Sequence, residues 1–186
     1  MTKIITGVTG LVATVALVGS VAFAQFSAQV TASNVVFATG NAALEVTDPT
    51  EVGGDGFGST LNLSSVSTGE FTPGEVLNQN FQIRNSGDVD LDLTLQLTSA
   101  TGDWGVLNSV FEVRLYPVET AEEDKPTFAT FATWNSAPQS LPQNPIAAGA
   151  TEDWTVEVRL NSSADNTAAG KTVNTNWVLN GVEPTP

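Results

Sequence analysis

The sequence predicts an all-β fold, an antiparallel β-sandwich of about eight strands with a short helical insertion. Apolar and polar residues alternate in many short runs, which is the pattern of strands with one buried face. Turn-forming Gly, Pro, Asn and Asp residues separate these runs. No long stretch has the period of an amphipathic helix, so the sheets are expected to form the core.

Residues 1–24 have the pattern of a signal peptide. Lys3 is followed by an uncharged apolar stretch, which ends in a small-x-small motif at residues 22–24. Cleavage is therefore expected between Ala24 and Gln25, and the alternative position is between Gln25 and Phe26. The stretch is also long enough to span a bilayer, so an uncleaved anchor is the alternative. Its glycines, and the lack of a basic cluster after it, favour cleavage.

The segment that follows, residues 25–37, is expected to be the first strand. The first four of its apolar residues alternate with polar ones. A strand at a new N-terminus pairs with a sheet edge either in its own chain or in a neighbouring chain. The apolar positions are Phe26, Ala28, Val30, Ala32, Val35 and Phe37.

Residues 38–180 are expected to form the sandwich domain, with an insertion at 117–150 and a short polar tail at 181–186. Two runs of alternating apolar and polar residues, 77–83 and 91–97, flank the turn sequence Asn85-Ser86-Gly87-Asp88. We expect these runs to form a hairpin. The expected strands of the domain are 43–46, 58–66, 77–83, 91–97, 111–115, 154–160 and 173–179.

The insertion breaks this strand pattern. Phe128, Phe131 and Trp134 are three residues apart, which predicts one or two helical turns with an aromatic side. Either this short helix packs on the core, or its aromatic side is an exposed patch for lateral contact between subunits.

Composition excludes several kinds of chemistry. The chain has no Cys and no His, so it lacks disulfides, the usual general base and the commonest zinc ligand. No catalytic residue and no cofactor is therefore assigned, and an enzyme such as a glycosidase that uses only carboxylates is the least favoured function. Without Lys3, five basic residues oppose 20 acidic ones, a net charge of about −15. This charge argues against nucleic acid and anionic membranes as partners.

Three carboxylates could still bind a cation. Asp88, Asp90 and Asp92 are two residues apart, so on a strand they would share one face. Such a row could recruit Ca²⁺. The alternative is a solvated strand face that discourages unwanted edge pairing.

Several segments resemble, in their order and spacing, the TasA/camelysin family of exported bacterial biofilm-matrix proteins. The similarity covers nearly the whole chain. The segments that carry it are Ala16-Leu17-Val18-Gly19-Ser20 in the leader, Val36-Phe37-Ala38-Thr39-Gly40, Ala43-Leu44-Glu45-Val46, Leu61-Asn62-Leu63-Ser64, Thr72-Pro73-Gly74-Glu75, Phe81-Gln82-Ile83-Arg84-Asn85-Ser86-Gly87, Ala148-Gly149-Ala150-Thr151 and Asn161-Ser162-Ser163-Ala164-Asp165-Asn166 with Gly170-Lys171.

The resemblance implies a jelly-roll-like sandwich that polymerises head-to-tail into extracellular fibres. Residues 25–37 of one copy would be the donor strand, inserted into a groove of the next copy, so the main partner is the chain itself. A minor anchor or matrix protein is left open as a further partner. The peptidase activity implied by the name camelysin is not expected, because a zincin site needs His. The alternative function is a monomeric cell-surface adhesion or binding module, in which residues 25–37 pair within their own chain.

Overall fold

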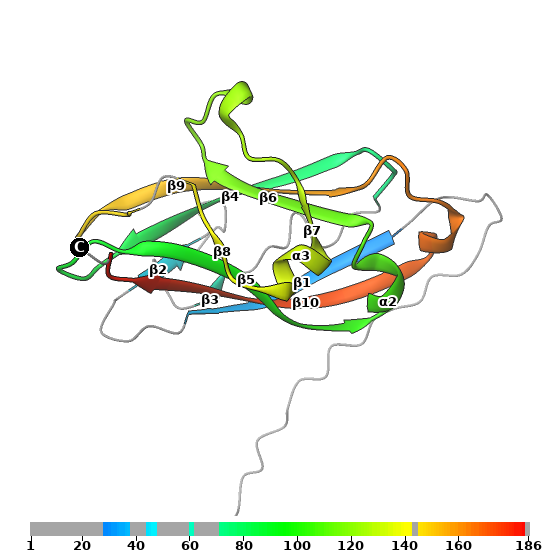
Figure 1. The fold of residues 1–186 in the computed structure, drawn as a ribbon, viewed down its shortest axis with the longest axis horizontal. Helices are drawn as coiled ribbons and strands as arrows, with labels where there is room; N and C mark the ends of the chain where they lie inside the picture. Colours follow the sequence, from blue (N-terminus) through cyan, green and yellow to red (C-terminus); the bar gives the residue numbers. More distant parts are fainter. Residues whose placement is uncertain (1–27, 38–43, 48–59, 62–70, 143–144, 185–186) are drawn as a thin grey trace, which may run out of the picture.

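The computed structural model describes residues 28–37, 44–47, 60–61, 71–142 and 145–184. Within these ranges the chain forms two five-stranded sheets, which pack face to face as a sandwich (Figure 1). The predicted all-β sandwich is confirmed.

One sheet, called here the β10 sheet, has the strand order β3-β1-β10-β5-β8. Its central strand β10 lies between β1 and β5. The bounds are β3 (Thr60–Leu61), β1 (Ala28–Phe37), β10 (Lys171–Val182), β5 (Asp92–Gly102) and β8 (Gln139–Ser140).

The other sheet, called the β9 sheet, has the order β2-β4-β9-β6-β7. All of its pairings are antiparallel, whereas the β10 sheet contains one parallel pair, β1 with β10. The bounds are β2 (Leu44–Thr47), β4 (Val76–Asn85), β9 (Thr151–Leu160), β6 (Phe111–Pro117) and β7 (Ala129–Thr130).

Each of the eight expected strands has a counterpart among the described residues, and β3 represents the expected strand at 58–66 by two residues. The sequence did not predict β7 and β8. These strands have two residues each, too few for an alternating pattern to be visible.

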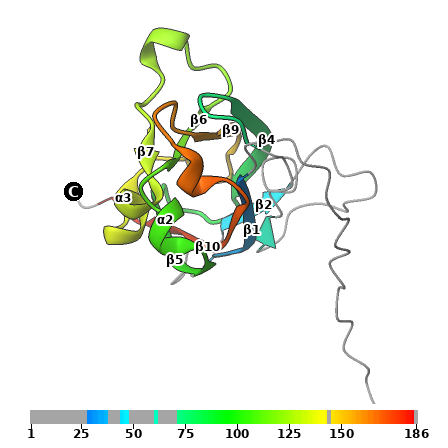
Figure 2. The ribbon, with the colours of Figure 1, turned by 90° about the vertical axis from the view of Figure 1, so that its right-hand side faces the viewer.

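Short helices lie at one end and along one side of the sandwich (Figures 1 and 2). The insertion contains the helix α3 (Phe131–Ser136), whose N-cap Thr130 accepts a hydrogen bond from the Thr133 amide through Oγ1. Phe131 and Trp134 are buried, so α3 packs on the core and the alternative of an exposed aromatic patch is wrong. The other helices are α2 (Trp104–Leu107), η1 (Glu122–Asp124) and η2 (Asn166–Ala168).

The core lies between the two sheets and draws on both. Alternate residues of β5 and β10 are buried, as the period of two requires, whereas residues 154–158 of β9 are all buried. The largest side chains with almost no exposure are Trp154, Phe71, Phe111, Phe131, Ile83, Leu91, Leu93, Leu97, Leu107, Ile146 and Leu160.

The predicted hairpin between residues 77–83 and 91–97 is wrong. β4 belongs to the β9 sheet and β5 to the β10 sheet, so the turn between them is a corner that joins the two layers. Both runs alternate because both face the same core, and alternation alone does not distinguish strands that pair from strands that oppose each other across a sandwich.

Asn85 holds this corner. Its side chain is fully buried, and its Nδ2 donates to the carbonyls of Val89 at 2.7 Å, Ile146 at 3.2 Å and Ala147 at 3.2 Å. Its Oδ1 accepts from the amide of Gly87 at 3.0 Å. One buried side-chain amide thus provides hydrogen-bond partners for backbone groups of two segments, the corner at residues 87–89 and residues 146–147.

We predict that Asn85→Ala lowers the free energy of unfolding by about 2–4 kcal/mol, because it removes the hydrogen bonds of a fully buried side chain to four backbone groups of the corner. Urea denaturation followed by Trp fluorescence measures this. Asn78→Ala, at an exposed position of the same strand, is the control and should change the value by less than about 0.5 kcal/mol. A similar loss in both variants would contradict the role given to Asn85.

Candidate assembly interface

The sequence of β10, the strand that pairs with β1, suits a central position in a sheet. β10 contains three Val, two Thr and one Trp, which favour strands. Alternate side chains of β10, Val173, Thr175, Trp177 and Leu179, are buried on its core side. The residues between them lie on the outer side and are exposed or half-buried.

β1 runs parallel to β10, and its register aligns the apolar positions of the two strands. Four positions of the expected donor strand lie opposite the core-facing residues of β10. The pairs are Val30 with Val173, Ala32 with Thr175, Val35 with Trp177 and Phe37 with Leu179. Ala28 lies opposite Lys171 at the start of β10, whereas Phe26 and the expected cleavage residues Ala24 and Gln25 fall outside the described residues.

Trp177 packs with the core independently of β1. Its ring makes edge contacts with Phe131 and Trp134, each at 5.8 Å between centroids. Its Nε1 donates to Oγ1 of Thr175 at 3.0 Å, so the polar atom of the buried indole has a partner. The core side of β10 is therefore held by α3 as well as by its neighbouring strands.

Asp103 fixes the start of β10, next to the position where β1 begins. The Thr172 amide donates to Oδ2 of Asp103 at 3.1 Å, and Nζ of Lys171 lies 3.1 Å from its Oδ1. The Asp103 amide donates to the Thr172 carbonyl at 2.7 Å. The amide of Thr172, and then the Lys171 ammonium, hold the pKa of Asp103 below its ordinary value.

Gly102 permits this close approach of β5 to β10. Its φ is +89°, and a Cβ at this position would lie 2.5 Å from the Thr172 carbonyl oxygen. Any other residue would be strained and would push the two strands apart at this end.

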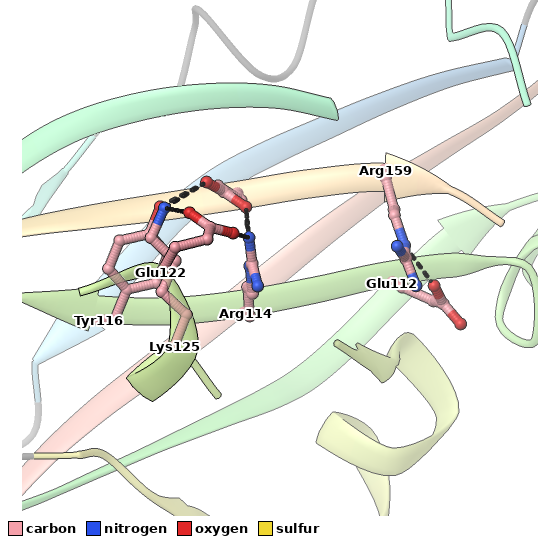
Figure 3. Close-up of polar contacts among 7 residues, drawn as sticks. Glu112, Arg114, Tyr116, Glu122, Lys125 and Arg159 are labelled. Carbon is pink, nitrogen blue, oxygen red and sulfur yellow. Dashed lines mark hydrogen bonds and ion pairs between the residues drawn. The ribbon is translucent and has the colours of Figure 1, made fainter. Parts of the chain in front are cut away.

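A cluster of charged residues lies on the outer face of the β9 sheet, on the strands β6 and β9 (Figure 3). On neighbouring strands, Arg114 Nε donates to Glu157 Oε2 at 2.7 Å, and Arg159 Nε donates to Glu112 Oε2 at 2.6 Å. The hydroxyl of Tyr116 also donates to Glu157. Both glutamates are buried.

The segment after β6 closes over this charged cluster. The ring of Phe128 contacts both guanidinium groups, with its centre 4.4 Å from Cζ of Arg114 and 3.9 Å from Cζ of Arg159. Lys125 lies 2.5 Å from Glu122 and lowers the pKa of that carboxyl. Burial, and then the hydrogen bond to Glu157, raise the pKa of Tyr116.

The arrangement of this charged cluster indicates a structural role. Both buried glutamates have a guanidinium partner and at least one further hydrogen bond, from Tyr116 to Glu157 and from Asn161 to Glu112. A general acid or a carboxylate nucleophile needs access to substrate, whereas this cluster attaches the insertion to the outside of the sheet.

The three aspartates do not share one strand face. Asp88 lies in the corner after β4, Asp90 accepts from the Ala148 amide at 2.9 Å, and Asp92 begins β5. Among the described residues, no group of three or more Asp, Glu, His or Cys side chains is placed to hold a metal ion.

The sequence analysis did not identify which strand pairs with β1, and it did not identify the charged cluster. The motifs Glu112-x-Arg114 and Glu157-x-Arg159 were visible as oppositely charged pairs on alternate positions, but the pairing of their strands was not. Likewise, the 173–179 strand was predicted, but its parallel partner lies more than a hundred residues earlier in the sequence.

No protein-family model matches this chain, and no curated protein is detectably similar to it in sequence. In the part of the chain that the structure describes, no helix is both long and apolar enough to cross a bilayer.

Asp103 makes a pH-dependent contribution to the stability of the interface. Because its folded pKa is lowered, the ionised carboxylate stabilises the folded chain above the ordinary pKa, and this contribution is lost as the pH falls through the lower folded value. We therefore expect Asp103→Asn to unfold at a lower temperature than wild type at neutral pH. The difference should shrink as the pH falls below about 4.

Thermal unfolding followed by circular dichroism between neutral and acidic pH measures this difference. Asp165→Asn is a second test of the same rule, because hydrogen bonds from Thr167 lower the pKa of Asp165, and its difference from wild type should shrink over the same pH range. A pH-independent difference for Asp103→Asn would contradict the assignment.

Proposed function

We propose that this chain is a secreted structural subunit that polymerises into extracellular matrix fibres by donating residues 25–37 to the next subunit. The observation that supports the proposal most is the parallel pairing of β1 with the central strand β10. The same pairing can form within one copy or between two copies, because the backbone partners are identical in both cases.

Loss of β1 would expose a long acceptor edge. Eight register pairs join β1 to β10, and they extend from Ala28 with Lys171 to Phe37 with Leu179. Without β1, one side of β10 would present unpaired backbone groups next to buried apolar side chains. A strand from a second copy restores both the hydrogen bonds and the apolar cover, which is the mode of β-strand addition.

The connection of β1 favours exchange. β1 is followed by β2, which belongs to the opposite sheet, so β1 is not held in a hairpin with a sequence neighbour. If cleavage after Ala24 frees its other end, β1 can leave when its pairings with β10 and with the two-residue strand β3 break. Donation to the next copy is a head-to-tail contact that does not close, so it produces a filament.

The surface charge suits a subunit that needs a specific contact in order to assemble. In the described part of the chain, each of the five basic side chains is paired with a carboxylate. The remaining acidic groups give copies of the chain a mutual repulsion that disfavours unspecific contacts.

The second candidate is the monomeric adhesion or binding module. The observation in its favour is that β1 pairs with β10 of its own chain in the single copy described. The two functions differ in one measurable respect, which is whether β1 is exchanged between copies.

Removal of the donor strand tests the proposal. We expect the mature chain that begins at Gln25 to form filaments visible by electron microscopy, and the chain without residues 25–37 to form none. A synthetic peptide of residues 25–37 should then stabilise the truncated chain against unfolding, because it fills the β10 edge. Filaments from the truncated chain would sink the donor-strand mechanism.

A matched pair of substitutions avoids truncation. Val30 lies opposite buried Val173, and Thr31 lies opposite exposed Asn174. We expect Val30→Asp to reduce filament yield at least about tenfold, because a charge enters the apolar interface. Thr31→Asp should change the yield by less than about twofold. Equal effects of the two changes on sedimented filament would contradict the proposed register.

A further inference from the structure

Irregularities in two strand pairings meet at one point of β10. In the β1–β10 pair the register shifts between Ala32 and Val35, and in the β10–β5 pair it shifts between Asn176 and Trp177. Both shifts therefore lie beside the same stretch of β10. We call the three neighbouring segments, Ser33–Asn34, Asn176–Trp177 and Thr98, the bulge row.

Each shift inserts one residue into a neighbour of β10. Ala32 pairs with Thr175 and Val35 with Trp177, so three steps along β1 match two along β10. On the other side, Asn176 pairs with Ser99 and Trp177 with Leu97, which leaves Thr98 as the extra residue of β5. Extra residues of this kind bend a strand and increase its twist locally.

Side chains hold the β5 half of the bulge row. Thr98 Oγ1 donates to the Asn176 carbonyl at 3.3 Å, and Asn176 Nδ2 donates to Ser99 Oγ at 2.7 Å. These contacts involve β5 and β10 alone. The shape of β10 at this point therefore does not depend on which chain supplies β1.

The sequence of β1 matches this shape. Its apolar positions are two residues apart up to Ala32, then three apart to Val35, then two apart to Phe37. The extra residue in β1 restores Val35 and Phe37 to positions opposite Trp177 and Leu179, which are buried. A strand without the extra residue would place one half of its apolar positions on the outer face, because a one-residue slip exchanges the two faces.

We infer that the bulge row sets the register of the exchanged strand and selects a second copy of this chain as the partner. The β10 edge accepts a parallel strand whose apolar positions are spaced two, three and two residues apart, and it discriminates against a regularly alternating strand. This inference rests on the proposed strand exchange and adds the feature that decides which strand fits.

Pairs of engineered cysteines test the register on both sides of the bulge row. The chain has no Cys, so a disulfide can form only between introduced residues. Gln29→Cys with Thr172→Cys reports the register before the bulge row, and Val36→Cys with Val178→Cys reports it after. We expect both pairs to cross-link in otherwise unchanged mature chain.

Deletion of Asn34 makes the spacing regular and is the decisive variant. We expect it to reduce the cross-link yield of one of the two pairs at least about tenfold, since both halves of β1 cannot stay in register. Asn34→Ala keeps the length and should leave both yields within about twofold. Wild-type yields at both pairs in the deletion variant would overturn the inference.

Peptide competition gives the same answer without relying on the folding of a variant. A peptide of residues 25–37 should inhibit filament growth of the mature chain, and the same peptide without Asn34 should need an at least about tenfold higher concentration. Equal potency of the two peptides, including no inhibition by either, would overturn the selection of register.

The cross-links also separate this inference from the function on which it rests. Non-reducing electrophoresis shows whether the disulfides join two copies or close within one. Cross-links within single copies alone would contradict strand exchange, whereas the loss of one pair on deletion of Asn34 would still support the register set by the bulge row.

Discussion

The β10 sheet depends on the pairing of its central strand on both sides. β5 pairs with β10 along almost its whole length, and α3 packs on the core side of β10 through Trp177. The other side is completed by β1, which comes from the opposite end of the described sequence. A buried central strand with an open edge is unfavourable in water, so a partner for this edge is the requirement from which both candidate functions follow.

Most of the sandwich is held by contacts that do not involve β1, and the exception is β3, which pairs with β1. The Asn85 corner joins the two layers, and the charged cluster of Glu112, Arg114, Glu157 and Arg159 attaches the insertion to the outer face of the β9 sheet. Asp103 and Gly102 bring the end of β5 against the start of β10. These interactions hold a nearly complete sandwich in which one strand is exchangeable, and such an arrangement suits a subunit that must be stable before it assembles.

The sequence predicted the positions of the strands better than it predicted which strands pair. Alternation identified the eight main strands, because burial of one face leaves a local period of two. It placed the runs around Asn85 in one hairpin, because strands that face each other across the core alternate in the same way as strands that pair. β7 and β8 were too short to detect. For the candidate interface, the apolar residues of β1 were evident from sequence, but β10 as their partner and the bulge row were not. Pairing over so long a separation leaves no local signal apart from the three-residue step between Ala32 and Val35.

A mixture of two variants, each with one introduced cysteine, tests most directly whether β1 is exchanged between copies. One population carries Thr31→Cys and the other Asn174→Cys, which lie opposite each other in the β1–β10 register. A disulfide between these residues can then form only between two copies. Strand exchange predicts that filaments grown from the mixture and oxidised contain disulfide-linked dimers of the two chains. Filaments without such dimers, together with efficient internal cross-linking of the chain that carries both cysteines, would show that β1 stays in its own subunit and would contradict assembly by strand donation.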